Sequence, residues 1–153
     1  KSKWGDGPWQ DEPDKIQWTD ADTGLPCLIV RSKGLGALCG YVGVSEGHPA
    51  FDIEDYYSLG CDVHGGLSYA AFCEEDGDES ESICHLPEPG QPDRVYLLGF
   101  DCAHGADVVP AREGRERDQG LPSLREPYAS YRDVAYVKGE CRSLARQLVA
   151  MAC

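Results

Sequence analysis

Two short segments of the sequence, residues 62–66 and 101–107, combine histidine and aspartate with glycine. Histidine exchanges a proton near neutral pH, and a carboxylate beside it can orient the ring or bind a metal ion. Glycine next to a histidine lets a ligand approach the backbone closely. These residue types predict a polar pocket for acid–base chemistry. Its candidate catalytic residues are Asp62, His64, Asp101 and His104, and its candidate ligand-binding residues are Gly65, Gly66, Cys102 and Asp107.

The second segment directly follows residues 94–100, the most apolar strand-like run of the chain. Loops on a rigid scaffold often carry functional groups, which favours a site here. If both segments leave the same edge of a sheet, their histidines and aspartates meet in one pocket. The structural alternative for residues 62–66 is a turn in which Asp62 caps its own backbone.

The candidate residues would also suit a divalent metal ion, whose ligands the sequence leaves open. Zinc is one alternative, although the spacing of its four candidate ligands matches no standard site. Residues 76–78 give only a fragment of a calcium-binding EF-hand loop. The four zinc candidates are Cys84, His85, Cys102 and His104.

The elements that must position these segments indicate an α+β fold. Apolar runs at 26–31 and 37–44 flank a glycine-containing turn, which predicts a hairpin, and further strands are expected near 67–73 and 94–100. Apolar residues three or four apart after Ser130, its expected N-cap, predict a C-terminal amphipathic helix with Arg132 on its wet face. We therefore expect a small, mainly antiparallel sheet packed by a long C-terminal helix. The apolar helix residues are Val134, Val137, Cys141, Leu144, Ala145, Leu148 and Ala152.

The length of 153 residues fits one domain. Residues 1–24 lack a sustained hydrophobic period, so we expect an irregular N-terminal arm held over the domain by its tryptophans. Residues 25–153 then form the domain, with an acidic loop at 74–82 and a flexible polar loop at 110–127.

The net charge is −13, from 14 basic and 27 acidic side chains. This balance opposes duplex DNA binding by phosphate neutralisation, and no apolar run is long enough to span a bilayer. The acidity belongs to residues 1–110, whose charge is −15, whereas residues 111–153 carry +2. Its densest part is the run Glu74, Glu75, Asp76, Asp78, Glu79 and Glu81.

The eight cysteines allow two interpretations. Four disulfides are one alternative, but several cysteines lie in apolar runs, where a free thiol behaves as a small buried residue. We expect mostly free thiols in a reducing compartment, with one local disulfide, such as Cys73 to Cys84, across the acidic loop. No leader with a cleavage site opens the chain, so the expected location is cytoplasmic.

Several sequence blocks resemble a group of small uncharacterised proteins met in bacteriophage and bacterial genomes. The resemblance covers roughly residues 26–150 and implies a mobile-element or intracellular setting, without an activity, ligand or catalytic residue. The blocks are Gly40-Tyr41-Val42-Gly43-Val44 with Gly47-His48-Pro49, Asp62-Val63-His64-Gly65-Gly66-Leu67-Ser68-Tyr69, Ile83-Cys84-His85-Leu86-Pro87-Glu88-Pro89-Gly90, Gly99-Phe100-Asp101-Cys102-Ala103-His104 and Tyr131-Arg132-Asp133-Val134-Ala135-Tyr136-Val137.

Three functions compete on this evidence. The first is a small hydrolase-like enzyme with a His/Asp pocket, which would bind a small molecule and would be metal-assisted if a divalent ion is held. The second is a non-enzymatic acidic protein that occupies a basic site on a host protein, since a negative field steers such an association. The third is a small-ligand-binding protein with an apolar pocket under the C-terminal helix. The oligomeric state is left open.

Overall fold

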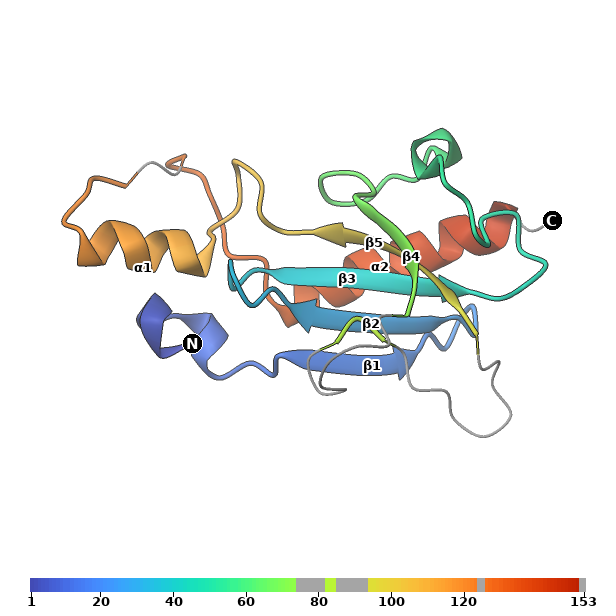
Figure 1. The fold of residues 1–153 in the computed structure, drawn as a ribbon, viewed down its shortest axis with the longest axis horizontal. Helices are drawn as coiled ribbons and strands as arrows, with labels where there is room; N and C mark the ends of the chain where they lie inside the picture. The colour runs from blue at the N-terminus through green and yellow to red at the C-terminus, as the bar shows by residue number, and fades with distance from the viewer. Residues whose placement is uncertain (74–81, 85–93, 124–125, 152–153) are drawn as a thin grey trace.

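A five-stranded antiparallel sheet forms the centre of the protein, in the computed structural model that describes residues 1–73, 82–84, 94–123 and 126–151. The strand order across the sheet is β1-β2-β3-β5-β4, so β2, β3 and β5 lie inside it (Figure 1). The predicted hairpin of β2 and β3 is confirmed, with Ile29 opposite Gly40. The strands are β1 (Lys15–Thr19), β2 (Pro26–Arg31), β3 (Leu38–Val44), β4 (Tyr69–Phe72) and β5 (Tyr96–Asp101).

Helix α2 (Val134–Met151) packs across one face of this sheet (Figure 1). The predicted apolar stripe is buried from Val137 to Leu148 and joins the main core. A side chain at Gly40 of β3 would place its Cβ 2.9 Å from the Cys141 sulfur, so glycine lets helix and strand approach closely. The α+β class, with a C-terminal helix on an antiparallel sheet, is therefore confirmed.

The central strands are buried on both faces. Leu98 and Phe100 of β5 face the α2 side, whereas Leu97 belongs to a second cluster with Leu28 and Tyr41. The nearly continuous apolar sequence of β5 follows from this double burial, because neither face of the strand needs polar side chains.

The N-terminal arm is more ordered than its sequence predicts. Residues 15–19 form edge strand β1, with Ile16 and Trp18 packed against the main core. The prediction of an irregular arm is wrong for this strand because two inward side chains suffice once β2 offers an edge to pair with. Two short 3-10 turns, η1 (Ser2–Trp4) and η2 (Pro8–Gln10), precede it. Trp9 is buried edge-on against Tyr131, as expected for a tryptophan that holds the arm.

The prediction of a flexible loop at 110–127 is wrong for its first half, which forms helix α1 (Pro110–Asp118). Pro110 lies in the first turn, where proline needs no hydrogen-bond donor. Gly114 lets the backbone of η1 pass close to the helix, since an added Cβ would lie 2.6 Å from the Lys3 carbonyl oxygen. A tertiary contact thus stabilises a helix whose charged sequence suggests a flexible loop (Figure 1).

The start of α2 differs from the prediction as well. Asp133 caps the helix, because its Oδ1 accepts a hydrogen bond of 2.9 Å from the Tyr136 amide. Ser130 instead forms a short parallel bridge with Asp107, so it is not the N-cap. Arg132 precedes the helix and points to a buried carboxylate rather than to the wet face.

The predicted Cys73–Cys84 disulfide is confirmed, with Cα atoms 4.5 Å apart. Five further cysteines of the described residues are free thiols: Cys27, Cys39, Cys61, Cys102 and Cys141. Residues 74–81, which hold the acidic run, lie outside the described part of the chain, as does His85. No helix within the described ranges is long and apolar enough to cross a membrane.

Candidate functional site

The two polar segments meet in the structure. His64 Nε2 lies 2.8 Å from Asp107 Oδ2, and the His64 and His104 rings have centroids 5.7 Å apart. Gly65, with a φ of +70°, packs directly on the second ring: a Cβ there would lie 2.0 Å from His104 Nε2. The glycine is therefore needed both for the backbone conformation and for the approach of the two loops.

Asp107 is the buried centre of this site. Its side chain is 0% exposed and accepts hydrogen bonds from His64 Nε2, Arg132 Nε at 2.9 Å and the His104 amide at 3.0 Å. Burial by itself would raise the pKa of Asp107, but these bonds outweigh it and lower the pKa below its usual value. Asp107 is thus an ionised acceptor enclosed by donors.

His64 is engaged at both ring nitrogens. Because the Asp107 carboxylate can only accept, Nε2 of His64 carries the proton and donates it. In the neutral ring the other nitrogen, Nδ1, accepts a hydrogen bond of 2.8 Å from the Tyr136 hydroxyl. The result is a continuous hydrogen-bonded chain from the Tyr136 hydroxyl through His64 to Asp107.

Arg132 and Tyr136 reach the site from the start of α2. The guanidinium carbon of Arg132 lies 4.7 Å above the Tyr136 ring, a cation–π contact. Burial and the charge of Glu140 raise the pKa of Tyr136, which Arg132 partly opposes. The tyrosine is therefore a neutral hydroxyl at rest, and its proton is directed at the imidazole.

Local backbone pairing fixes the relative position of these segments. The Ser130 amide donates to the Ala106 carbonyl at 3.0 Å, and the Val108 amide donates to the Ser130 carbonyl at 2.9 Å. This short parallel pairing holds Asp107 beside the chain that leads into α2. Backbone hydrogen bonds therefore fix the position of Asp107 relative to the segment that carries Arg132.

His104 and Asp101 form the more exposed half of the site. Their side chains are 41% and 36% exposed, with His104 Nε2 3.1 Å from Asp101 Oδ1. The two atoms are not aligned as a hydrogen bond, and the buried Nε2 has no hydrogen-bond partner among the described residues. Ser68 donates to the other carboxylate oxygen at 3.2 Å.

Asp62 and Cys102, two of the predicted site residues, have different surroundings. Asp62 is exposed, and its backbone exchanges two hydrogen bonds with the Gln147 side chain. Cys102 is buried, and burial together with the charge of Asp107 raises the pKa of its thiol far above the usual value. A thiol held protonated in this way is a poor nucleophile.

A cavity of about 230 Å³ adjoins the first loop. Gly65 and Gly66 line one side, and aromatic rings from the 3-10 turn η3 (Tyr56–Leu59) line another. Apart from the two glycines, the lining residues are Tyr56, Tyr57, Cys61 and Leu67. The predicted ligand-binding glycines therefore border a hollow of small-molecule size.

The residue types at this site are ones that bind metal ions, but too few of them lie close enough together to act as ligands of one ion. Among the described residues, no three His, Cys, Asp or Glu side chains are placed to hold one. Both nitrogens of His64 are already hydrogen-bonded, and Arg132 occupies the second oxygen of Asp107. The site is an acid–base network with an internal cation.

Sequence reasoning missed Arg132 and Tyr136 as site residues. Both lie beside the predicted apolar stripe, where a polar residue is normally assigned to solvent. Their only sequence signal is their spacing of four, which places them on one side of the helix start. Nothing in that spacing points to His64 or Asp107.

Comparisons with known proteins yield no match among family models, curated proteins or solved structures. The defining feature of the site is a hydroxyl, an imidazole and a buried carboxylate in series.

Proposed function

We propose that the protein is a small hydrolase-like enzyme in which Tyr136 is the nucleophile. The observation that supports this is the hydrogen-bonded series Tyr136–His64–Asp107, with both distances at 2.8 Å. A hydroxyl, an imidazole and a carboxylate stand in this order in the triads in which a histidine activates a hydroxyl nucleophile. Asp107 holds the ring in the tautomer that leaves Nδ1 free to accept a proton.

In the first step, the Tyr136 oxygen attacks the carbonyl carbon of an ester as its proton moves to His64 Nδ1. The buried Asp107 carboxylate stabilises the resulting imidazolium. His64 then returns the proton to the leaving alcohol oxygen as the carbon–oxygen bond breaks, which leaves an acyl group on Tyr136. Water hydrolyses this ester in a second step, with His64 taking the water proton and returning it to the tyrosine oxygen.

His104 and Arg132 assist without joining the series. The exposed His104 ring beside His64 is the group best placed to orient the attacking water. The guanidinium of Arg132 lies over the ring of Tyr136, where it stabilises negative charge that develops on the tyrosine oxygen as the proton leaves.

The cavity beside Gly65 and Gly66 supports a small substrate. Its volume of about 230 Å³ lies below the range of drug-sized pockets, and its aromatic lining suits an apolar acyl or aryl group. We therefore expect short-chain aryl esters to be better substrates than long-chain esters.

The test is hydrolysis of 4-nitrophenyl acetate by the full chain and three variants. Tyr136→Phe and His64→Gln should each lower kcat/KM by at least about 100-fold, since each removes a member of the proton-transfer series. The matched control is Tyr128→Phe, because Tyr128 is exposed, and it should keep full activity.

Mass spectrometry of the protein during turnover checks the covalent step separately. An acetyl group on a peptide that contains Tyr136, absent from the His64→Gln variant, would support the nucleophile. Turnover that survives in Tyr136→Phe would overturn it, as would the lack of hydrolysis across a panel of short aryl esters.

The setting we propose is cytoplasmic and of the mobile-element type. It is supported by the free thiols of Cys27, Cys102 and Cys141, which are buried as small apolar residues. The resemblance of the sequence blocks to proteins of bacteriophage and bacterial genomes supports the same setting.

A further inference from the structure

The substrate cavity, which is the hollow beside Gly65 and Gly66, is lined by uncharged groups. Its described lining consists of two phenol rings, a thiol, one leucine and the two glycines. The hydrogen bond from Tyr56 to Tyr57 raises the pKa of the Tyr56 phenol, and burial raises the pKa of the Cys61 thiol. Recognition of a ligand must therefore come from the aromatic rings and from the field of charges nearby.

The tyrosine pair presents aromatic surface that core packing does not use. The ring centroids of Tyr56 and Tyr57 lie 4.4 Å apart, and the Tyr56 hydroxyl donates to the Tyr57 hydroxyl at 3.1 Å. Tyr56 packs against the main core, whereas Tyr57 is 74% exposed. The face of a phenol ring carries partial negative charge and attracts a cation within about 6 Å of its centroid. Tyr57 thus offers a cationic ligand a contact surface at the cavity.

The chain around the substrate cavity is acidic. All its described lining residues come from the segment 46–72, which carries five carboxylates and no Lys or Arg. Two of these carboxylates, Asp55 and Asp62, are exposed and adjoin lining residues in the sequence, so they lie within the screening length of about 8 Å at physiological salt. The cation of the catalytic site, Arg132, is offset by the ionised Asp107. The cavity therefore lies in a negative local field.

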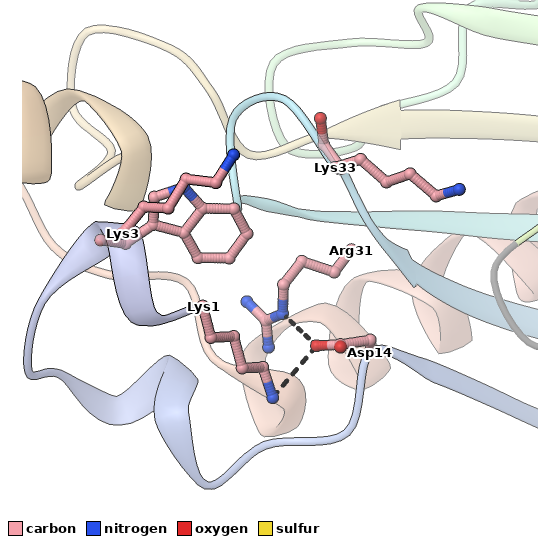
Figure 2. Close-up of a pocket in the computed structure, with 7 residues that line it drawn as sticks. Lys1, Lys3, Asp14, Arg31 and Lys33 are labelled. Carbon is pink, nitrogen blue, oxygen red and sulfur yellow. Dashed lines mark hydrogen bonds and ion pairs between the residues drawn. The ribbon is translucent and has the colours of Figure 1, made fainter.

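A second cavity, of about 200 Å³, has a lining of the opposite kind. It lies between the N-terminal turn η1 and the turn that joins β2 to β3, and Lys or Arg supplies four of its seven described lining residues. Figure 2 shows two of them, Lys1 and Arg31, meeting at Asp14. A cationic ligand is therefore expected at the substrate cavity and not at this one.

We propose that the substrate cavity binds an alkylated ammonium group, so that the substrate is a small ester carrying such a group. This inference rests on the proposed ester hydrolysis for the role of the cavity. A bare ammonium is strongly hydrated and needs acceptors in direct contact, whereas a methylated one is satisfied by the face of Tyr57 and the field of Asp55 and Asp62. The volume of about 230 Å³ suits one such group with a short acyl chain.

Calorimetric titration of the full chain with choline and with 3,3-dimethylbutan-1-ol tests the inference without any need for hydrolysis. The two molecules have the same shape, because a carbon in the second replaces the charged nitrogen of the first. Choline should bind at least about fivefold more tightly. Tyr57→Leu should reduce this preference to less than about twofold, since the ring is lost. The matched control is Tyr128→Leu, which removes an equally exposed tyrosine and should keep the preference.

Alkylation of the cavity thiol locates the bound cation. Choline at about five times its dissociation constant should slow the reaction of Cys61 with N-ethylmaleimide about sixfold, by mass action. Cys39, a partly buried free thiol of β3 outside the cavity, should react at an unchanged rate. Peptide mass spectrometry measures both rates in one sample. Equal protection of the two thiols, or of neither, would contradict a site at the cavity.

The ester pair acetylcholine and 3,3-dimethylbutyl acetate connects binding to turnover, and kcat/KM should be at least about fivefold higher for acetylcholine. Hydrolysis of 4-nitrophenyl acetate with equal affinity for choline and its neutral analogue would overturn the ammonium site and leave the proposed function standing. Preferential choline binding at Cys61 without hydrolysis of any ester would contradict the proposed function and support the site. No choline binding up to about 10 mM, or an equal loss of preference in Tyr128→Leu, would overturn the inference.

Discussion

Asp107 and Arg31 are two buried charges of opposite sign, each enclosed by complementary groups. They are linked through consecutive residues, since Tyr131 hydrogen-bonds to Arg31 and Arg132 hydrogen-bonds to Asp107. The partners differ, however. Asp107 is surrounded by donors that include a histidine, whereas Arg31 is surrounded by carboxylates and carbonyl oxygens.

This difference separates a network that can move a proton from one that only holds segments together. The Asp107 network passes through an imidazole and ends at the Tyr136 hydroxyl. The Arg31 guanidinium donates to carboxylates, to carbonyl oxygens and to the Tyr131 hydroxyl, and so joins the N-terminal arm to the sheet and to Tyr131. A buried charge alone therefore does not indicate catalysis, and the chemistry of its neighbours decides.

The largest effect is expected for Asp107→Ala, which removes the centre of the first network. It leaves Arg132 and His64 without their buried acceptor, so we expect a loss of about 3–5 kcal/mol in the free energy of unfolding together with loss of esterase activity. Urea denaturation measures the first effect. Asp101→Ala is the control, because its side chain is 36% exposed, and it should cost less than about 1 kcal/mol.

Arg31→Met removes the opposite charge and should cost less. Asp14, one of its two carboxylate partners, is 54% exposed and can be hydrated once the guanidinium is gone. We expect a loss of about 1.5–3 kcal/mol in the free energy of unfolding, with kcat/KM on 4-nitrophenyl acetate unchanged in the folded fraction. A loss as large as that of Asp107→Ala would show that exposure of the partners does not separate the two networks.

The pH dependence of stability should also distinguish the two networks, with Asp107 as the main titrating group. Its pKa is lowered in the folded state, so its stabilisation is complete above the ordinary value of 3.8 and is lost as the pH falls toward the folded pKa. Urea midpoints between about pH 5 and pH 3 should fall steeply in the wild type and more gently in Asp107→Asn. Asp14→Asn should keep most of the wild-type slope, because hydrogen bonds of a half-exposed carboxylate count for less.

Each network contains one tyrosine hydroxyl, which allows a matched pair of deletions. Tyr131→Phe and Tyr136→Phe should each lower the free energy of unfolding by about 0.5–1.5 kcal/mol. Esterase activity should distinguish them, with loss only in Tyr136→Phe. Equal activity in the two variants would remove the functional difference between the networks.

The smallest effect tests the contact between the two loops. Gly65→Ala and Gly66→Ala share the cost of a positive φ, at +70° and +80°, but only the first places a Cβ against His104. We expect the two variants to have similar thermal midpoints. Gly65→Ala should in addition have about tenfold lower esterase activity than Gly66→Ala. Identical kinetics would mean that the position of His104 is unimportant for turnover.

The periodic parts of the fold were predictable because their signal is local. The apolar stripe of α2 and the runs of β2, β3 and β5 state which faces are buried, and the structure buries those faces. Strand β1 and helix α1 were not predictable in this way. Each is stabilised by an element elsewhere in the chain, β2 for the strand and η1 for the helix.

The candidate site divides along the same line. By itself the sequence determined which residue types stand beside strand ends, and hence that His64, His104, Asp101 and Asp107 were candidates. Only the tertiary structure decided that Asp107 is the buried acceptor, that Tyr136 completes the series and that Asp62 is linked by its backbone instead. The physical reason is that hydrogen-bond partners are chosen by burial and direction across 43 and 72 residues of chain, and no local pattern records that choice.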